Sequence, residues 1–274
     1  MTAPPDFSLE GRVAIITGGA GLLGVRHAEA IAAAGGVPVI ADVLGRDAQA
    51  RAEAIARDSG RPALGVECDI TRADAVQAML GTVLDRFGRV DILVNNAANN
   101  PKVEAPGRNF SRFERFPIDQ WNADVAVGLT GAFLCAQIVG GELARQKRGV
   151  IINISSEYGV IAPDQRLYYK DGVAADDQPV KPVTYTVVKA GLHGLTLYLA
   201  TYWAQAGVRV NTITLGGVEQ GQPAEFLERA TAKIPMGRMA RPTDFQGALV
   251  YLCSDAAAFV TGANLVVDGG KTIW

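Results

Sequence analysis

Tyr185 and Lys189 stand four positions apart in the segment YTVVK. In an α-helix this spacing puts both side chains on one face, one turn apart. A free tyrosine ionises near pH ~10, and a neighbouring cation stabilises the phenolate and lowers that pKa. The pair therefore predicts a group that exchanges a proton with a hydroxyl or a carbonyl. The same spacing arises by chance on exposed helices, so an ordinary surface pair is the alternative.

A glycine-rich segment near the N-terminus is the second motif with chemical content. Gly19-Ala20-Gly21-Leu22-Leu23-Gly24 follows an apolar run and opens a predicted helix that runs through Ala34. Glycines at this spacing permit a tight turn and leave the N-terminus of the helix facing a pyrophosphate. The segment therefore predicts a dinucleotide site.

Asp42 is placed to select the dinucleotide. It ends the second apolar run, 18 positions beyond Gly24, where a carboxylate can accept hydrogen bonds from the adenosine ribose. Its charge would repel the extra phosphate of NADP(H), so NAD(H) is expected, although Arg46 is close enough in sequence to weaken this preference. The alternative role for Asp42 is a helix N-cap. Asp69 is expected at the adenine edge, or as the cap of a helix that begins near Arg72.

These residues need a scaffold, and the apolar runs of the chain predict one. The runs alternate with helical stretches, and several are solid blocks of Val and Ile, as in parallel strands that are buried on both faces. The predicted fold class is α/β: a doubly wound, Rossmann-type parallel sheet of about seven strands with helices on both faces, in a single domain. The predicted strands are 13–17, 37–42, 63–69, 92–96, 150–155, 208–214 and 264–268.

Two segments, 99–119 and 163–182, interrupt this alternation. Both follow the C-terminal ends of predicted strands, where such sheets bind ligands, so we expect them to form walls of a substrate pocket. Their basic side chains are expected either to hold a carboxylate or phosphate of the substrate or to form a solvated surface. These residues are Lys102, Arg108, Arg112, Arg115, Arg166 and Lys170.

Composition excludes several other classes of function. With 49% hydrophobic and 20% charged residues, the chain is typical of a globular enzyme. A net charge of −2 gives no reason to expect nucleic acid or an anionic membrane as partner. Neither a signal peptide nor an apolar run of membrane-spanning length is expected. Cys68, Cys135 and Cys253 are interpreted as buried thiols in a reducing cytoplasm. No metal is expected, and His27 and His193 are interpreted as helix residues with local hydrogen bonds.

With these motifs in hand, the chain resembles the short-chain dehydrogenase/reductase family over nearly its full length. The resemblance implies that Ser156 polarises the substrate oxygen, that Tyr185 exchanges the proton, and that Lys189 holds the nicotinamide ribose and lowers the tyrosine pKa. Ser156 is preferred to Ser155 because Ser156-Glu157-Tyr158-Gly159 matches the serine-x-x-glycine of the family. The matching motifs are Thr17-Gly18 with the glycine loop, Cys68-Asp69-Ile70, Asn95-Asn96-Ala97-Ala98, Ile154-Ser155-Ser156, Tyr185-x-x-x-Lys189, Arg209-Val210-Asn211 and Thr261-Gly262 with Asp268-Gly269-Gly270.

The resemblance also implies NAD as cofactor and a set of residues that contact it. The expected contacts are Gly18, Gly21, Leu22, Leu23, Asp42, Val43, Asp69, Ile70, Asn96, Ala97, Ala98, Tyr185, Lys189, Gly216 and Val218.

The sequence departs from the usual family pattern at several positions. The glycine loop reads TGxxGxxG, the spacing of the extended branch, whereas the DGG ending is that of the compact branch. Tyr185 follows Ser156 by 29 positions, and the surplus residues form the segment 163–182. Gly128 replaces an asparagine that holds a proton-relaying water, so a main-chain carbonyl or a water is expected to substitute. Ala98 replaces a glycine, and Leu215 replaces a proline.

The predicted function is an NAD(H)-dependent transfer of hydride between the nicotinamide and a secondary alcohol or ketone. The glycine loop and the polar loops favour a sugar-like or polyol substrate. Two alternatives stay open: an NAD(H)-binding subunit with little catalysis, and a dehydratase or epimerase that uses NAD transiently. A homodimer or homotetramer is expected, with the apolar stretch Gly191–Trp203 at an interface or wholly buried within one subunit.

Overall fold

Seven parallel strands form one sheet in the order β3-β2-β1-β4-β5-β6-β7. The computed structural model describes residues 6–99 and 112–274. All seven predicted strands are confirmed, with end shifts of a few residues. Their bounds are β1 Val13–Thr17, β2 Val37–Asp42, β3 Leu64–Glu67, β4 Ile92–Asn95, β5 Gly149–Ser156, β6 Val208–Leu215 and β7 Asn264–Val267.

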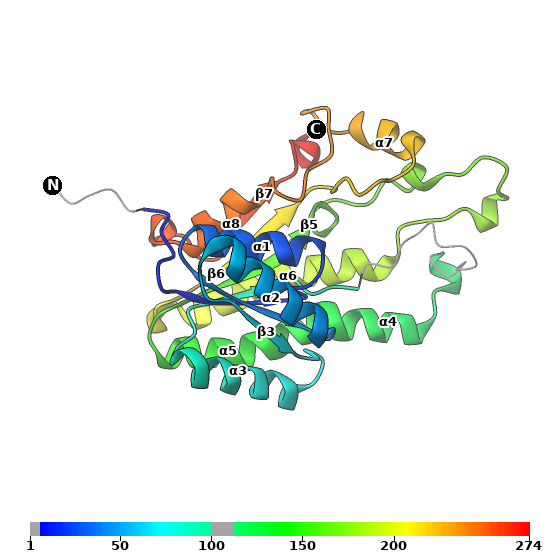
Figure 1. The fold of residues 1–274 in the computed structure, drawn as a ribbon. Helices are drawn as coiled ribbons and strands as arrows, with labels where there is room; N and C mark the ends of the chain where they lie inside the picture. The colour runs from blue at the N-terminus through cyan, green and yellow to red at the C-terminus, as the bar shows by residue number, and fades with distance from the viewer. Residues whose placement is uncertain (1–5, 100–111) are drawn as a thin grey trace.

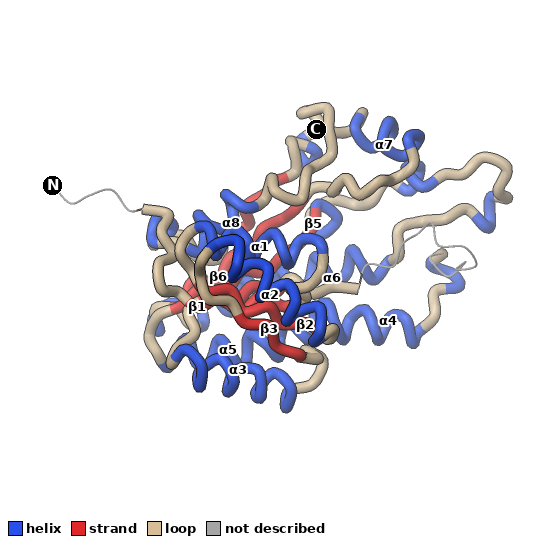
Figure 2. Tube along the Cα trace, in the orientation of Figure 1, coloured by secondary structure: helices blue, strands red, loops and turns tan. Residues whose placement is uncertain are grey.

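Helices cover both faces of the sheet, as Figures 1 and 2 show. The side chains of α1, α2 and α8 share one hydrophobic core with one face, and those of α3, α5 and α6 share a second core with the other. The blocks of Val and Ile are therefore buried on both sides, as predicted. The helices are α1 Leu22–Ala33, α2 Gly45–Ser59, α3 Ala73–Phe87, α4 Ile118–Val125, α5 Gly131–Arg145, α6 Val183–Tyr202, α7 Ala224–Thr231 and α8 Gln246–Cys253.

The strand order reverses direction at β1, which pairs with β2 on one side and β4 on the other. In an open parallel sheet, the loops after the strands on the two sides of this point diverge and leave a crevice at the carboxyl edge. The glycine loop follows β1, and both interrupting segments begin beyond β4 and β5 at the same edge. The topology therefore brings all the predicted motifs to one edge of the sheet.

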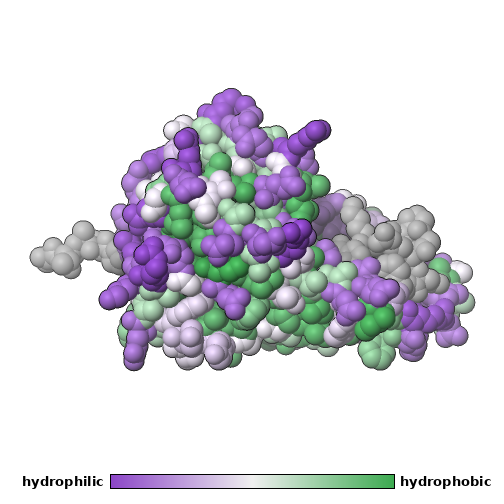
Figure 3. Space-filling view, turned by 90° about the horizontal axis from the view of Figure 1, so that it is seen from below, coloured by the Kyte–Doolittle hydropathy of each residue, from purple (hydrophilic) through white to green (hydrophobic). Residues whose placement is uncertain are grey.

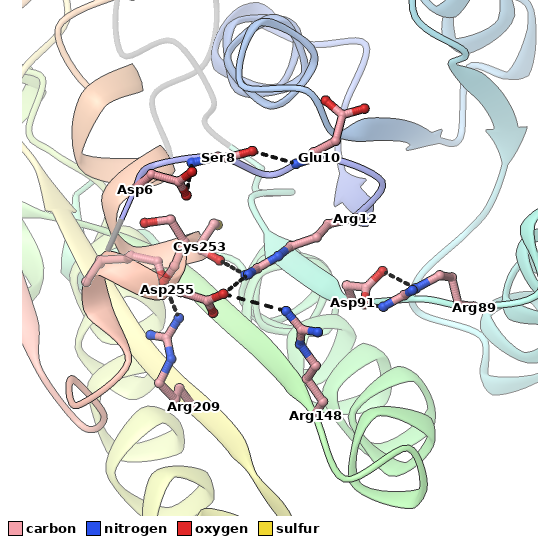
Figure 4. A network of polar contacts seen from close by, with 12 residues as sticks. Asp6, Ser8, Glu10, Arg12, Arg89, Asp91, Arg148, Arg209, Cys253 and Asp255 are labelled. Carbon is pink, nitrogen blue, oxygen red and sulfur yellow. Dashed lines mark hydrogen bonds and ion pairs between the residues drawn. The ribbon is translucent and has the colours of Figure 1, made fainter. Parts of the chain in front are cut away.

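The opposite, amino edge of the sheet carries an ion-pair network (Figure 4). Arg12, directly before β1, donates to the main-chain oxygen of Cys253 at 2.9 Å and to the Asp255 carboxylate at 2.5 Å. Arg148, directly before β5, lies 3.7 Å from the same carboxylate, and Arg209 of β6 donates to the Leu252 oxygen at 2.8 Å. These contacts tie the C-terminal end of α8 to the starts of three strands, away from the carboxyl edge.

The interrupting segments are only partly irregular. Of the first, residues 100–111 lie outside the described residues, and they include Lys102 and Arg108; its last two residues already belong to α4. The second contains two short 3₁₀ turns, Gln165–Tyr168 and Ala175–Asp177. In Figure 1 this segment reaches out from the sheet, and the C-terminal residues lie beside α7.

One continuous helical segment, Ile118–Arg145, joins α4 and α5 through a π-helical turn at Ala126–Thr130. It is 28 residues long, and an 18-residue stretch within it has a mean hydropathy of 1.6, so by length and composition alone it could cross a membrane, which the sequence analysis did not expect. However, α5 packs on α3, β4 and β5 as a core helix does, which makes its composition weak support for a membrane. Figure 3, seen from the side of α3 and α5, shows hydrophobic residues in the middle of the view between polar ones.

Candidate active site

A cavity of about 840 Å³ opens at the carboxyl edge of the sheet. Every residue that the sequence predicts for catalysis or cofactor binding lines it, from Gly18 on one wall to Val218 on the other. The predicted residues are therefore brought together, although they come from segments spread over most of the chain.

The glycine loop lines this cavity, and a side chain at Gly18 or Gly24 would clash with the main chain. Gly18 has a φ of +60°, and a Cβ there would lie 2.8 Å from Ala97 Cα. A Cβ on Gly24 would lie 2.3 Å from the Gly18 main-chain oxygen. Gly21 is the N-cap of α1 and provides no side-chain acceptor, so the first N–H groups of the helix face the cavity. This arrangement fits the pyrophosphate of a dinucleotide.

Asp42 ends β2 at the rim of the cavity with its carboxylate held by the main chain. Its oxygens accept hydrogen bonds from Ala20 N and Leu44 N, both at 3.1 Å. The N-cap alternative is wrong, because α2 begins at Gly45 with Leu44 as its N-cap and without a side-chain cap bond. A carboxylate has about four lone-pair sites, so Asp42 keeps acceptor capacity for ribose hydroxyls.

The ends of β1 and β4 are locked together beside the glycine loop. Asn96 donates from its side chain to the Thr17 oxygen at 2.9 Å and to the Gly18 oxygen at 3.2 Å. Thr17 Oγ1 accepts from Asn96 N at 3.0 Å. Asp69 accepts from Thr71 N and Oγ1 at 3.0 and 2.7 Å, and it does not cap α3, whose N-cap is Arg72. Asn96 therefore shapes the loop, and Asp69 lines the cavity.

Helix α6 presents Tyr185 and Lys189 to the cavity from one face, as the spacing predicts. At the start of the helix, the buried Thr184 hydroxyl donates to the Asp124 carboxylate at 2.6 Å, which fixes α6 against α4. Lys189 is buried and donates from Nζ to the Ile154 oxygen at 2.8 Å. The surface-pair alternative is therefore wrong, because Lys189 is buried, Tyr185 is half-buried and both line the cavity.

The two serines at the end of β5 have different surroundings. Ser155 Oγ donates to the Lys189 main-chain oxygen at 2.8 Å and lies 3.1 Å from His193 Nε2. Ser156 Oγ accepts from Tyr158 N at 3.4 Å and also hydrogen-bonds the Tyr185 side chain. Ser155 thus anchors α6 to the sheet, whereas Ser156, the serine chosen from the sequence, faces the phenol.

The ionisation of this cluster differs from the sequence-based expectation. Burial raises the pKa of Tyr185, the Ser156 hydrogen bond opposes this increase, and the charge of Glu157 adds to it. The expected lowering by Lys189 does not dominate, because Lys189 Nζ is 5.9 Å from the ring centroid and bonds a carbonyl. Burial and the nearby Lys181 lower the pKa of Lys189 to about 8. Tertiary packing therefore outweighs the helix spacing in setting the tyrosine pKa.

Gly128 lies on the π-helical turn between α4 and α5, next to a small cavity of about 10 Å³. Tyr185, Lys189 and Asp124 line the same cavity. This is about the volume that one water needs. The space beside Lys189 thus has room for a water, one of the two substitutes that the sequence suggests for the missing asparagine.

Restoring the asparagine at this position is expected to destabilise the protein. A Cβ on Gly128 would lie 2.4 Å from Val188 Cγ1, and overpacking of this kind costs about 1–3 kcal/mol. Gly128→Asn should therefore lower the melting temperature, and Val188→Ala in the same chain should recover part of the loss. Gly141→Asn in α5 is the matched control, because nothing lies within 4 Å of a Cβ there. Equal melting temperatures for the two single variants would contradict the clash.

Of the basic residues that the sequence singled out, the described ones do not line the cavity: Arg112, Arg115, Arg166 and Lys170. Arg115 pairs with Asp177 at 3.4 Å, and Arg166 pairs with Asp164 at 2.8 Å. They form a solvated surface, which was the second of the two expectations. The lysines that do line the cavity are Lys181, Lys189 and Lys271, and sequence reasoning missed two of them.

Lys181 is the first missed residue. Its Nζ lies 3.8 Å from the centroid of the Tyr185 ring, within the range of a cation–π contact. It lies before α6, which begins at Val183 with Pro182 as its N-cap, so no helical spacing in the sequence points to it. Lys271 and Glu157 form the second missed feature, an ion pair on the cavity wall.

The described residues contain no group of three or more His, Cys, Asp or Glu side chains that could hold a metal ion. His27 is fully buried in α1, and neither ring nitrogen has a hydrogen-bond partner among the described residues, so the expected local hydrogen bond is absent. Burial lowers the pKa of His27 to about 4, which keeps the ring neutral.

Comparison with known proteins agrees with this geometry. A family model described as Enoyl-(Acyl carrier protein) reductase matches residues 20–272. The D-threitol dehydrogenase of Mycolicibacterium smegmatis is 36% identical over 273 residues, which are 98% of this chain and 95% of that protein. The structure of a short-chain type dehydrogenase/reductase from Mycobacterium marinum superposes with a TM-score of 0.84 at 30% identity, covering 98% of each chain.

A gluconate 5-dehydrogenase from Burkholderia cenocepacia, in complex with NADP and tartrate, has a TM-score of 0.85 and 31% identity and covers 99% of each chain. Together with the cavity that joins the glycine loop to Ser156, Tyr185 and Lys189, these matches define the class of the protein. The chain belongs to the short-chain dehydrogenase/reductase family.

Proposed function

We propose that this protein is an NAD-dependent dehydrogenase that interconverts a secondary alcohol of a polyol or sugar-like compound and the corresponding ketone. The observation that carries the proposal is the convergence of Ser156, Tyr185 and Lys189 on the cavity that also holds the glycine loop. The similarity to a D-threitol dehydrogenase supports a polyol as substrate.

Each of the three residues Ser156, Tyr185 and Lys189 has a separate role in the proposed reaction. Tyr185 takes the proton of the alcohol hydroxyl, and Ser156 donates a hydrogen bond to the oxygen as charge develops on it. Lys189 contributes a positive charge beside them. A bound nicotinamide would receive the hydride from the carbinol carbon, so the alcohol loses one hydride and one proton.

A substrate panel tests this proposal directly. Purified protein is mixed with NAD⁺ and, in turn, with tetritols, pentitols, sugar acids and simple secondary alcohols, and NADH formation is followed by absorbance. We expect the highest kcat/KM among the polyols. Turnover of lipophilic alcohols alone would reject the substrate class, and product formation without any net NADH would favour an epimerase or a dehydratase.

Asp42 supports NAD over NADP, and its charge can be removed without a change of shape. Asp42→Asn keeps an oxygen that can accept from the main chain but ends the repulsion of the extra phosphate. We expect the ratio of kcat/KM for NAD⁺ to that for NADP⁺ to fall about 10- to 100-fold, because a like charge at close range costs roughly 1–3 kcal/mol. The control is Asp47→Asn, an exposed carboxylate in the first turn of α2. A ratio that falls equally in both variants would contradict the role of Asp42.

We further propose a homo-oligomer in a reducing compartment such as the cytoplasm. The stretch Gly191–Trp203 is not wholly buried: Leu197, Tyr198 and Tyr202 of α6 are exposed, and the last two stack at 5.7 Å between centroids. Such a surface suits contact with a second copy. All three cysteines are buried free thiols, which is compatible with a reducing environment.

A further inference from the structure

A buried ion pair on the cavity wall has no assigned role in the proton and hydride transfer at Ser156, Tyr185 and Lys189. Glu157 and Lys271 are in direct contact, and only 4% and 9% of their side chains are exposed. Both line the cavity, and they come from the end of β5 and from the last residues of the chain.

Stability of the C-terminal segment does not depend on this pair alone. Asp268 accepts hydrogen bonds from Gly270 N at 2.8 Å and from Thr272 N at 2.7 Å. Trp274 Nε1 donates to the Lys233 oxygen at 3.0 Å. Moreover, the free-energy cost of removing two charges from water often offsets their attraction. A buried ion pair therefore adds little to the free energy of unfolding. Its position on the cavity wall therefore indicates a role in binding.

The pair still has hydrogen-bonding capacity. Glu157 accepts from Lys271 with one oxygen and from Gly217 N at 3.3 Å with the other. A carboxylate has about four lone-pair sites, and an ammonium has three donors. Lys271 Nζ also lies 4.9 Å from the centroid of the Tyr158 ring. The pair therefore offers an acceptor and a donor side by side, which is the complement of a hydroxyl group.

Glu157 also lies close to the reacting groups. It directly follows Ser156 in the chain, and its charge contributes to the raised pKa of Tyr185. Glu157 lines the same cavity as Ser156 and Tyr185, so a substrate whose reacting oxygen lies between those two has room to place its neighbouring carbon next to Glu157. An anionic group on that carbon would be repelled by Glu157, and the charge of Lys271 is already neutralised. A neutral hydroxyl fits both partners.

We propose that Glu157 and Lys271 form the subsite that binds the hydroxyl on the carbon next to the reacting carbinol, so that the enzyme selects vicinal diols. This inference rests on the proposed function and deepens it. Glu157 accepts the hydrogen bond of that hydroxyl and Lys271 donates to its oxygen. The reacting carbon is oxidised as before, and the subsite itself exchanges no proton or electron.

Two alcohols that differ only in this hydroxyl provide the test: vicinal butanediol and secondary butanol, each assayed with NAD⁺. For each enzyme we compare kcat/KM for the diol with kcat/KM for the mono-alcohol. We expect Glu157→Gln and Lys271→Met to reduce this ratio by about 10- to 100-fold, because the second hydroxyl loses a charged hydrogen-bond partner. Because both rates come from one preparation, misfolded protein cancels in the ratio. Glu225→Gln on α7, an exposed carboxylate that does not line the cavity, is the matched control.

A single variant leaves one charge buried without its partner and can impair folding. The double variant Glu157→Gln/Lys271→Met removes both charges, and it should fold and show the same loss of diol preference. Equal losses for the two alcohols, an unchanged ratio, or a sugar acid that is preferred and unaffected by Glu157→Gln would overturn the subsite. Failure of the proposed function looks different, because the unmodified enzyme would then form no net NADH with any alcohol or would oxidise lipophilic alcohols alone.

Discussion

Replacing Tyr185 with phenylalanine should abolish turnover while NADH binding is nearly retained. The phenol is the group that exchanges the substrate proton, and loss of a general acid or base lowers kcat on the order of 10³-fold. The phenyl ring keeps the contact with Lys181, whose Nζ lies 3.8 Å from the ring centroid. Steady-state kinetics with the best polyol, together with fluorescence titration of NADH, would measure the two effects separately.

The matched control is Tyr198→Phe, which removes a hydroxyl from the same helix on its exposed side. It should leave kcat unchanged. The raised pKa of Tyr185 adds a second readout, because alcohol oxidation requires the phenolate. The rate of the unmodified enzyme should thus increase as the pH rises above neutrality, and a phenylalanine variant that keeps this increase and its kcat would contradict the mechanism.

The fold was predictable because its determinants are local and repeated. The eight residues of β5 are all buried, and such a run of Val and Ile fits a strand that is covered on both faces. The glycines at 18 and 24 were equally predictable, since backbone geometry at these positions leaves no room for a Cβ. In both cases one short segment contains the whole physical constraint.

Features that depend on distant residues were not predictable. Glu157 and Lys271 are 114 positions apart, and neither belongs to a spacing pattern that points to the other. The direction of the Tyr185 pKa shift was wrong for a related reason: burial is set by every element around the phenol, whereas the helix spacing reports only Lys189. For the basic residues of the interrupting segments the sequence left two expectations open, and the ion pairs Arg115–Asp177 and Arg166–Asp164 at the surface favour the second, a solvated surface.

The adjacent serines should respond in opposite ways to the same substitution. Ser156→Ala removes a hydroxyl that hydrogen-bonds Tyr185 at the reacting position. Loss of a donor to a developing oxyanion lowers kcat about 10²- to 10³-fold, with little change in the melting temperature. Ser155→Ala instead removes a buried hydrogen bond to the Lys189 main-chain oxygen. This should lower the free energy of unfolding by about 1 kcal/mol, with a smaller effect on kcat.

Each serine is the control for the other, because the two variants share strand, size and chemistry. For each variant, kcat and the free energy of unfolding are measured. The mechanism requires that Ser156→Ala lowers mainly kcat and that Ser155→Ala lowers mainly the free energy of unfolding. The opposite pattern would assign the reacting hydroxyl to Ser155. That outcome would also require α6 to move, since Ser155 Oγ now lies 3.1 Å from His193 Nε2 and bonds the helix backbone.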